Sequence, residues 1–207
     1  SNARSRRLCC HVISTIPFNF RSEYGLSTSG NQLYNLITEE QKVRVREVFD
    51  LFSRYAGVRF VETANEGIAV VTGDTTVISD NSPTESVDGL ARGSVIAGVP
   101  TGDAMAIVSS FRNWGESEYG GDFFLEAMRQ IGEVLGLWHS YDTPSVLGNS
   151  LPGEGVFPSD NDLLHLRQLY PAAGTDIDLY RFSLDQPGRV TAEAIAARLA
   201  GSASTLD

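Results

Sequence analysis

Four polar side chains that lie close together in the sequence could bind a metal ion or react: Arg129, Gln130, Glu133 and His139. The imidazole of His139 can ligate zinc, and Glu133 could supply one carboxylate oxygen. Arg129 cannot bind a metal, because its guanidinium stays protonated, offers no lone pair and repels a dication. Gln130 cannot act as a general base, because an amide has no useful proton affinity near neutral pH. Two potential ligands beside a fixed positive charge make a poor zinc site.

The spacing of these residues resembles the active-site helix of the metzincin zinc proteases, whose motif is H-E-x-x-H-x-x-G-x-x-H. The matching segment reads Ala127-Met-Arg-Gln-Ile-Gly-Glu-Val-Leu-Gly-Leu-Trp-His-Ser140. Its three ligand positions hold Arg129, Glu133 and His139. Its general-base position holds Gln130, and its turn glycine is Gly136. The resemblance therefore implies a degenerate zinc motif, from which we expect no bound cofactor, and zinc only if this interpretation is wrong.

The resemblance extends beyond the motif, over residues 8–171. Leu147 follows His139 at the distance where a matrixin places the methionine of its Met-turn, and residues 158–170 look like the closing helix of matrixin and serralysin catalytic domains. The implied fold is α+β: a metzincin-like (zincin) twisted mixed sheet with an active-site helix and a closing C-terminal helix. Trp138 and Tyr141, on either side of His139, could line the cleft, although Trp138 could equally belong to the core.

An amphipathic helix is expected from Asp122, as its N-cap, to Leu135. Phe124, Met128, Ile131 and Leu135 fall on one face, and Glu126, Arg129, Gln130 and Glu133 on the opposite face. Taken alone, this pattern favours a solvated outer face. The positions of Gly136, His139 and Leu147 instead favour a metzincin-like frame. There we expect Arg129 to pair with Glu133 beside His139, in the electropositive role of the lost metal.

The remaining elements follow from periodicity and capping signals. Alternating apolar residues predict a strand within Cys10–Phe20, and Thr38 with Gln41 forms a capping-box pattern at the start of a helix. Further strands are expected at Val58–Thr63, Ile68–Thr72, Ser94–Val99 and Met105–Ser109. A polar surface loop, bordering a cleft, is expected over Asp74–Gly93. In the metzincin family, substrate adds as a strand along the sheet edge beside the motif helix, and the corresponding edge is expected within Val95–Ser109.

Three segments are expected along the chain. Residues 1–3 resemble the remnant of a cleaved affinity tag, and residues 4–171 form the metzincin-like domain. Residues 172–207 resemble the beginning of a bacterial pre-peptidase C-terminal domain, a small β-sandwich, and we expect a partial β-element of a longer protein there. The same resemblance implies a secreted, periplasmic or cell-surface location.

Composition excludes two classes of function. The net charge is −10 with a single lysine, Lys42, so clustered contacts to nucleic-acid phosphates are not expected. No apolar run approaches the length of about 20 residues that a membrane span needs.

Three functions remain open. The first is a catalytically inactive metallopeptidase homologue, a pseudoprotease that retains binding of a peptide or protein in its cleft. The second is a hydrolase with an altered metal site built from Glu133, His139 and a third ligand such as Asp142. The third is a purely structural module of a larger secreted protein. Metal content separates the second from the others, and peptide binding separates the first from the third.

Overall fold

The structure is a computed structural model that describes residues 14–78, 87–137, 145–148 and 158–170. All of these belong to the first of two units, Ser1–Thr175 and Asp176–Asp207. The expected domain boundary near residue 171 and the partial β-element after it lie outside the described residues, as does the expected tag remnant. No helix in the described part is long and apolar enough to cross a membrane.

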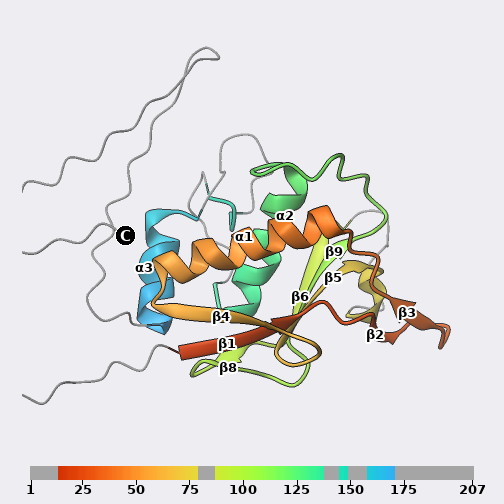
Figure 1. The fold of residues 1–207 in the computed structure, drawn as a ribbon, viewed down its shortest axis with the longest axis horizontal. Helices are drawn as coiled ribbons and strands as arrows, with labels where there is room; N and C mark the ends of the chain where they lie inside the picture. The colour runs from red at the N-terminus through yellow and green to blue at the C-terminus, as the bar shows by residue number, and fades with distance from the viewer. Residues whose placement is uncertain (1–13, 79–86, 138–144, 149–157, 171–207) are drawn as a thin grey trace, which may run out of the picture. The chain divides into compact units, whose positions relative to one another are not determined.

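A five-stranded, mostly parallel sheet forms the centre of the fold, with strand order β4-β1-β5-β9-β6 (Figure 1). The parallel strands are β1 (Ser14–Asn19), β4 (Val58–Thr63), β5 (Ile68–Gly73) and β9 (Met105–Ser109). The fifth strand, β6 (Gly89–Arg92), pairs antiparallel with β9. The strands expected around residues 58–63, 68–72 and 105–109 are therefore confirmed, and the class is mixed α/β.

The edge of the sheet differs from the expectation. The expected strand at Ser94–Val99 is instead a separate hairpin of β7 (Val95–Ile96) and β8 (Val99–Pro100). Ala97 and Gly98 turn it with φ values of 49° and 79°, the left-handed pair that a tight hairpin needs. β9 lies inside the sheet, so the edge falls on β6, within the segment expected to be a surface loop. β6 has only four residues, and its first is a glycine without a side chain. The segment therefore shows no alternation of apolar and polar residues that would predict a strand.

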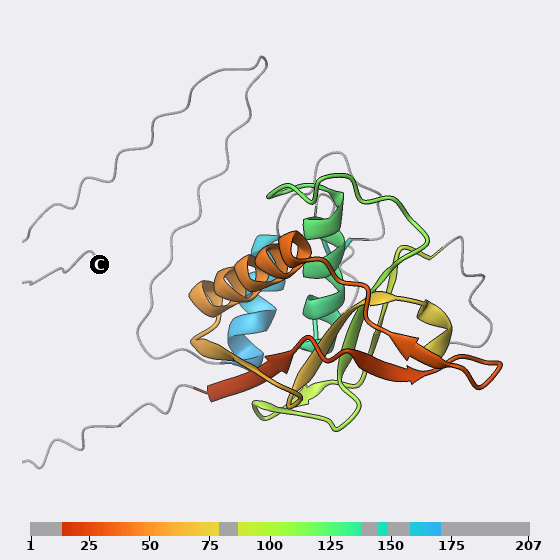
Figure 2. The same cartoon turned by 45° about the vertical axis from the view of Figure 1, so that its right-hand side comes forward.

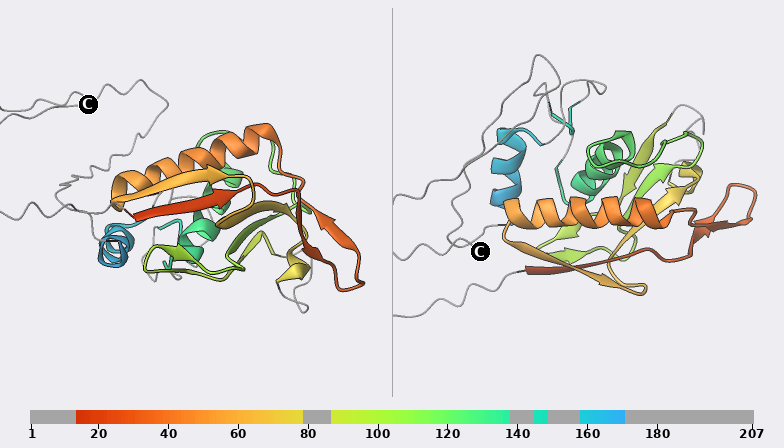
Figure 3. Two further views of the ribbon diagram at one scale, coloured as in Figure 1. Left: turned by 60° about the horizontal axis from the view of Figure 1, so that its bottom comes forward. Right: turned by 45° about the horizontal axis from the view of Figure 1, so that its top comes forward.

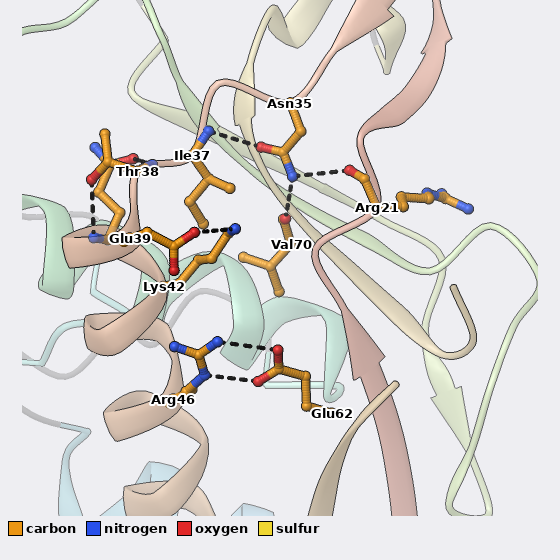
Figure 4. Close-up of polar contacts among 10 residues, drawn as sticks. Arg21, Asn35, Ile37, Thr38, Glu39, Lys42, Arg46, Glu62 and Val70 are labelled. Carbon is orange, nitrogen blue, oxygen red and sulfur yellow. Dashed lines mark hydrogen bonds and ion pairs between the residues drawn. The ribbon is translucent and has the colours of Figure 1, made fainter. Parts of the chain in front are cut away.

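The first long helix, α1 (Glu39–Tyr55), begins as its capping signals predict. Thr38 accepts a hydrogen bond from the Gln41 backbone, and the Gln41 side chain accepts one from Thr38. The helix lies along β1 and β4, and Arg46 on α1 forms a two-pronged ion pair with Glu62 on β4 at 2.7 and 3.1 Å (Figure 4). This solvent-exposed contact adds a polar link between the helix and β4.

Both faces of the sheet are covered. One face packs against α1 and α2 around a core that includes Ile16, Phe49, Val70 and Phe124, and the helices lie on this same side in Figures 2 and 3. The other face is covered by residues of β2 (Glu23–Leu26), β3 (Gln32–Tyr34) and the short 3-10 helix η1 (Thr75–Val77). Asn35 joins the layers, since its amide donates to the Arg21 and Val70 carbonyls (Figure 4).

The motif helix is α2 (Asp122–Val134), which follows β9 through the loop 110–121. Its N-cap is Gly121 and not Asp122, whose carboxylate is bound by Arg112 instead. The closing helix is α3 (Asp160–Leu169), with Ser159 as N-cap and Asp162 completing a capping box. The fold thus brings α2 against the sheet edge β6 at one side and towards α3 at its end.

Candidate functional site

The C-terminal end of α2 turns sharply at Gly136, as the motif predicts. Gly136 has a φ of 97°, its N–H donates to the Glu133 carbonyl, and the Leu137 N–H donates to the Gly132 carbonyl. These two bonds form the double cap in which a left-handed glycine ends a helix. The Tyr170 hydroxyl, at the end of α3, donates to the Leu135 carbonyl at 2.8 Å. Three hydrogen bonds therefore hold the turn at Gly136.

Leu147 lies against the middle of α2. It is 1% exposed, and a Cβ added at Gly132 would come within 2.9 Å of its Cδ2 atom. Residues 145–148 form a turn closed by a bond from the Gly148 N–H to the Ser145 carbonyl. The Ser145 hydroxyl donates to the Asp162 carboxylate and accepts from the Leu147 N–H. The turn with Leu147 is thus anchored to α3 and packed under the motif helix.

Arg129 ties α2 to the same turn. Its Nε atom donates to the Val146 carbonyl at 3.1 Å and lies 3.8 Å from the Glu126 carboxylate. The structure shows an ion pair of Arg129 with Glu126, three residues earlier on the helix, and the expected contact with Glu133 stays a prediction. The positive charge still acts on Glu133, since it lowers the pKa of that carboxyl against the effect of burial.

The polar face of α2 is not solvated, in contrast to what its pattern alone favours. Glu126 is 9% exposed and Gln130 is 3% exposed, and the Gln130 amide donates to Glu126 Oε1 at 2.7 Å. Both side chains lie over β6 at Gly89, where an added Cβ would come within 2.6 Å of Glu126 Oε1. A helix can approach a strand this closely only where the strand carries a glycine.

One side-chain atom in this buried layer lacks a hydrogen-bond partner among the described residues. Gln130 Oε1 is buried without a partner. Glu126 Oε2 has Arg129 as its nearest cation, at a distance too long for a hydrogen bond. Burial raises the pKa of Glu126, and the bond from Gln130 and the charge of Arg129 only partly counteract this. Burial is thus the largest influence on the Glu126 carboxyl, and it favours the neutral form.

Glu133, in the second ligand position, is partly buried and strongly perturbed. Desolvation, followed by the negative charge of Glu126, raises its pKa to about 7. Burial therefore favours the protonated form of this carboxyl. A carboxyl perturbed in this way marks Glu133 as a candidate functional residue.

A small pocket opens beside this layer, at the carboxyl end of β9 and the first turns of α2. Its polar lining consists of Asp88, Arg112, Asp122, Glu126 and Arg129, with Trp114 as its aromatic wall. Arg112 bridges Asp88 and Asp122 at 2.5 Å each and lies 4.6 Å from the centre of the Trp114 ring. Sequence reasoning missed this pocket. Its residues come from three segments, and only Trp114, an aromatic residue in a polar loop, signals it.

The other predicted site residues, Trp138, His139, Tyr141 and the alternative ligand Asp142, lie outside the described residues. The structure therefore brings together Arg129, Gln130, Glu133, Gly136 and Leu147 around α2. Within the described ranges no group of three or more His, Cys, Asp or Glu side chains is arranged to hold a metal ion.

Comparison with known proteins adds no family assignment. A scan against protein-family models finds no match, and a search of curated proteins finds no significant match.

Proposed function

We propose that the chain is a metzincin-like metallopeptidase homologue that does not hydrolyse peptides and that binds an extended peptide or protein segment along β6. We infer the absence of hydrolysis from one observation: the side chains at the motif positions make contacts within the protein. Arg129 bonds the Val146 carbonyl, and the amide of Gln130 bonds Glu126 in a buried layer. A metal-bound water at this position would meet a cation where the family has a ligand and an amide where it has a base.

The metzincin-like frame is supported by the elements that surround α2. The helix packs on a twisted mixed sheet, ends at a left-handed Gly136 and rests on Leu147, and α3 closes behind it. Each of these features agrees with what the sequence resemblance implies. Gly136 and Leu147 lie on different elements, so the amphipathic pattern of one helix does not explain both.

Peptide binding is supported by the hydrogen-bonding groups of β6. The Ser109 N–H donates to the Asp88 carbonyl, so residues 88, 90 and 92 face β9 in the antiparallel ladder. Gly89 and Ala91 then direct their N–H and C=O groups away from β9. Among the described residues β6 has no other strand partner. An extended segment can pair with these groups as an added strand, beside α2.

One substitution tests strand pairing without disturbing the sheet. Ala91→Pro removes an N–H that no bond to β9 uses, and proline is tolerated on edge strands. We expect the variant to fold and to lose binding of extended peptides from a display library, whereas the matched Ala91→Ser variant, which keeps the N–H, retains it. Equal binding by both variants would exclude pairing at β6.

Hydrolysis and metal content are tested on the purified protein. We expect no cleavage of casein or fluorogenic peptides above background and no stoichiometric zinc by elemental analysis. Chelator-sensitive cleavage, or zinc bonded to Glu133 and His139, would instead support the hydrolase with an altered metal site.

A further inference from the structure

We propose that Arg21 and Arg92 bind a phosphate group, as the free ion or as a monoester, on the face of the sheet opposite α1 and α2. The described residues leave the charge of Arg21 without a counterion. None of their carboxylates forms an ion pair with its guanidinium, and its Nε atom is buried without a hydrogen-bond acceptor. Acidic residues outnumber basic ones by 26 to 16 in this chain, so an arginine without a carboxylate is unusual here. Such a site does not depend on peptide binding at β6.

The backbone of Arg21 is held in place by two asparagines. Its N–H donates to Asn19 Oδ1 at 3.1 Å, and its carbonyl accepts from Asn35 Nδ2 at 3.2 Å. Asn19 is fully buried and donates in turn to the Glu66 carbonyl at 2.9 Å. The side chain of Arg21 points away from α1, and none of these bonds uses its guanidinium (Figure 4). The root of the side chain is therefore preorganised, which lowers the cost of ordering it around a ligand.

The pairing of the strands places Arg92 on the same face. Arg92 lies opposite Met105 on β9, and Met105 lies opposite Ala69 on β5. Ala69 and Met105 are buried on the face that β2, β3 and η1 cover, and directly opposite side chains share one face, so Arg92 lies there as well. Asn19 pairs with Ala69 in the same row, and Arg21 follows it by two residues, the spacing that returns an extended chain to one face.

The contacts of Arg92 leave part of its charge uncompensated. Its Nη1 atom donates to the Val77 carbonyl at 3.4 Å, and its Nε atom to the Asp103 carbonyl at 3.5 Å. The Asp103 carboxylate lies 3.7 Å from Nε, and all three distances exceed the usual length of about 2.9 Å. Burial, followed by the charge of Arg92, lowers the pKa of Arg21, so the two cations repel each other. An anion bound between them removes this repulsion and supplies the acceptor that Arg21 lacks.

Phosphate fits this pair better than a carboxylate does. One planar guanidinium occupies both oxygens of a carboxylate, whereas a tetrahedral phosphate has further oxygens for a second guanidinium. Its charge of about −1.5 to −2 near neutral pH also matches two cations, one of them partly compensated by Asp103. Removal of the Asp103 carboxylate should therefore tighten binding, and removal of either arginine should weaken it.

Inorganic phosphate, added at constant ionic strength, tests the site by NMR of the arginine Nε–H groups. The signals of Arg21 and Arg92 should shift to saturation, whereas that of Arg59, exposed on the opposite edge strand β4, should stay in place. Arg21→Gln should fold, because the guanidinium makes no bond among the described residues, and it should weaken binding about tenfold. Asp103→Asn should tighten binding, and Arg59→Gln, the matched control, should leave it unchanged.

Two further ligands separate the outcomes. O-phosphoserine distinguishes the two sources: binding of both phosphates identifies a site open to monoesters, and binding of inorganic phosphate alone identifies a site for the free ion. Acetate that binds as tightly as phosphate would overturn the proposal, and so would equal phosphate affinities of the wild type and Arg21→Gln. If Arg21→Gln does not fold, Arg92→Gln, with the same expected loss, decides instead.

Discussion

Arg129 and Val146 connect the motif helix to the turn beneath it through a bond of 3.1 Å from the guanidinium Nε to the backbone carbonyl. In a metzincin the residue at this position would ligate zinc. Here it holds α2 against the turn that contains Leu147, and it also compensates part of the charge of Glu126. Arg129 therefore has both a structural and an electrostatic role on α2.

Arg129→Gln should destabilise the fold by about 1–3 kcal/mol, because it removes the bond to Val146 and leaves Glu126 without its nearest cation. Without the arginine, the pKa values of Glu126 and Glu133 rise further, so the loss should be larger at pH 8 than at pH 5. Urea unfolding at both pH values measures this. Arg54→Gln, on an exposed part of α1, is the control. An identical loss of stability at both pH values would contradict the electrostatic contribution of Arg129.

The stability of the protein should fall between about pH 4.5 and 7 through Glu133. Its pKa in the folded protein, about 7, lies above its unfolded value, so the folded state binds more protons than the unfolded state in this range. Ionising the carboxyl therefore costs roughly 2–3 kcal/mol. Glu133→Gln should match the wild type near pH 4.5 and exceed it in stability at pH 8. If Glu133→Gln is no more stable than the wild type at pH 8, the pKa of Glu133 is not raised in the folded protein.

Gly89→Ala should destabilise the protein by about 1–3 kcal/mol through overpacking. The added methyl group would meet the Ile107 carbonyl at 2.7 Å as well as Glu126, and a carbonyl inside a paired strand cannot move aside. Gly102→Ala is the matched control, because nothing lies within 4 Å of the added Cβ there. Thermal unfolding of the two variants compares them, and equal melting temperatures would mean that α2 does not approach β6 this closely.

Leu147→Ala should cost about 2–5 kcal/mol, as for a buried leucine whose loss leaves a cavity against Gly132. Leu147→Met should cost less than about 1.5 kcal/mol, because the two side chains are close in volume. Denaturant unfolding distinguishes them. A methionine variant as unstable as the alanine variant would argue against a position equivalent to the Met-turn.

The combined change Arg129→His, Gln130→Glu and Glu133→His should create a three-imidazole site with His139. Zinc should then bind and raise the melting temperature, because a ligand specific to the native state stabilises it by mass action. The same variant with His139→Ala is the control and should bind more weakly. A folded triple variant that takes up no zinc would show that the spacing match to the metzincins is misleading.

The sequence by itself determined the elements whose signals are local. The capping box of α1, the strands at residues 58–63, 68–73 and 105–109, and the glycine turn after α2 depend on neighbouring residues and on spacings within one element. A sequence pattern records such short-range preferences directly, because a cap or a turn is made by residues a few positions apart.

The tertiary structure alone decided which polar residues are buried and which strand forms the edge. Glu126 and Gln130 look like a solvated face in the sequence, yet they lie on β6 because Gly89, far away in the chain, leaves room for them. Arg129 bonds Val146 because Ser145 and Asp162 hold that turn in place. Helical periodicity separates the two faces of α2, but it cannot tell which face another element will cover, since the contacts that cover it join residues distant in sequence.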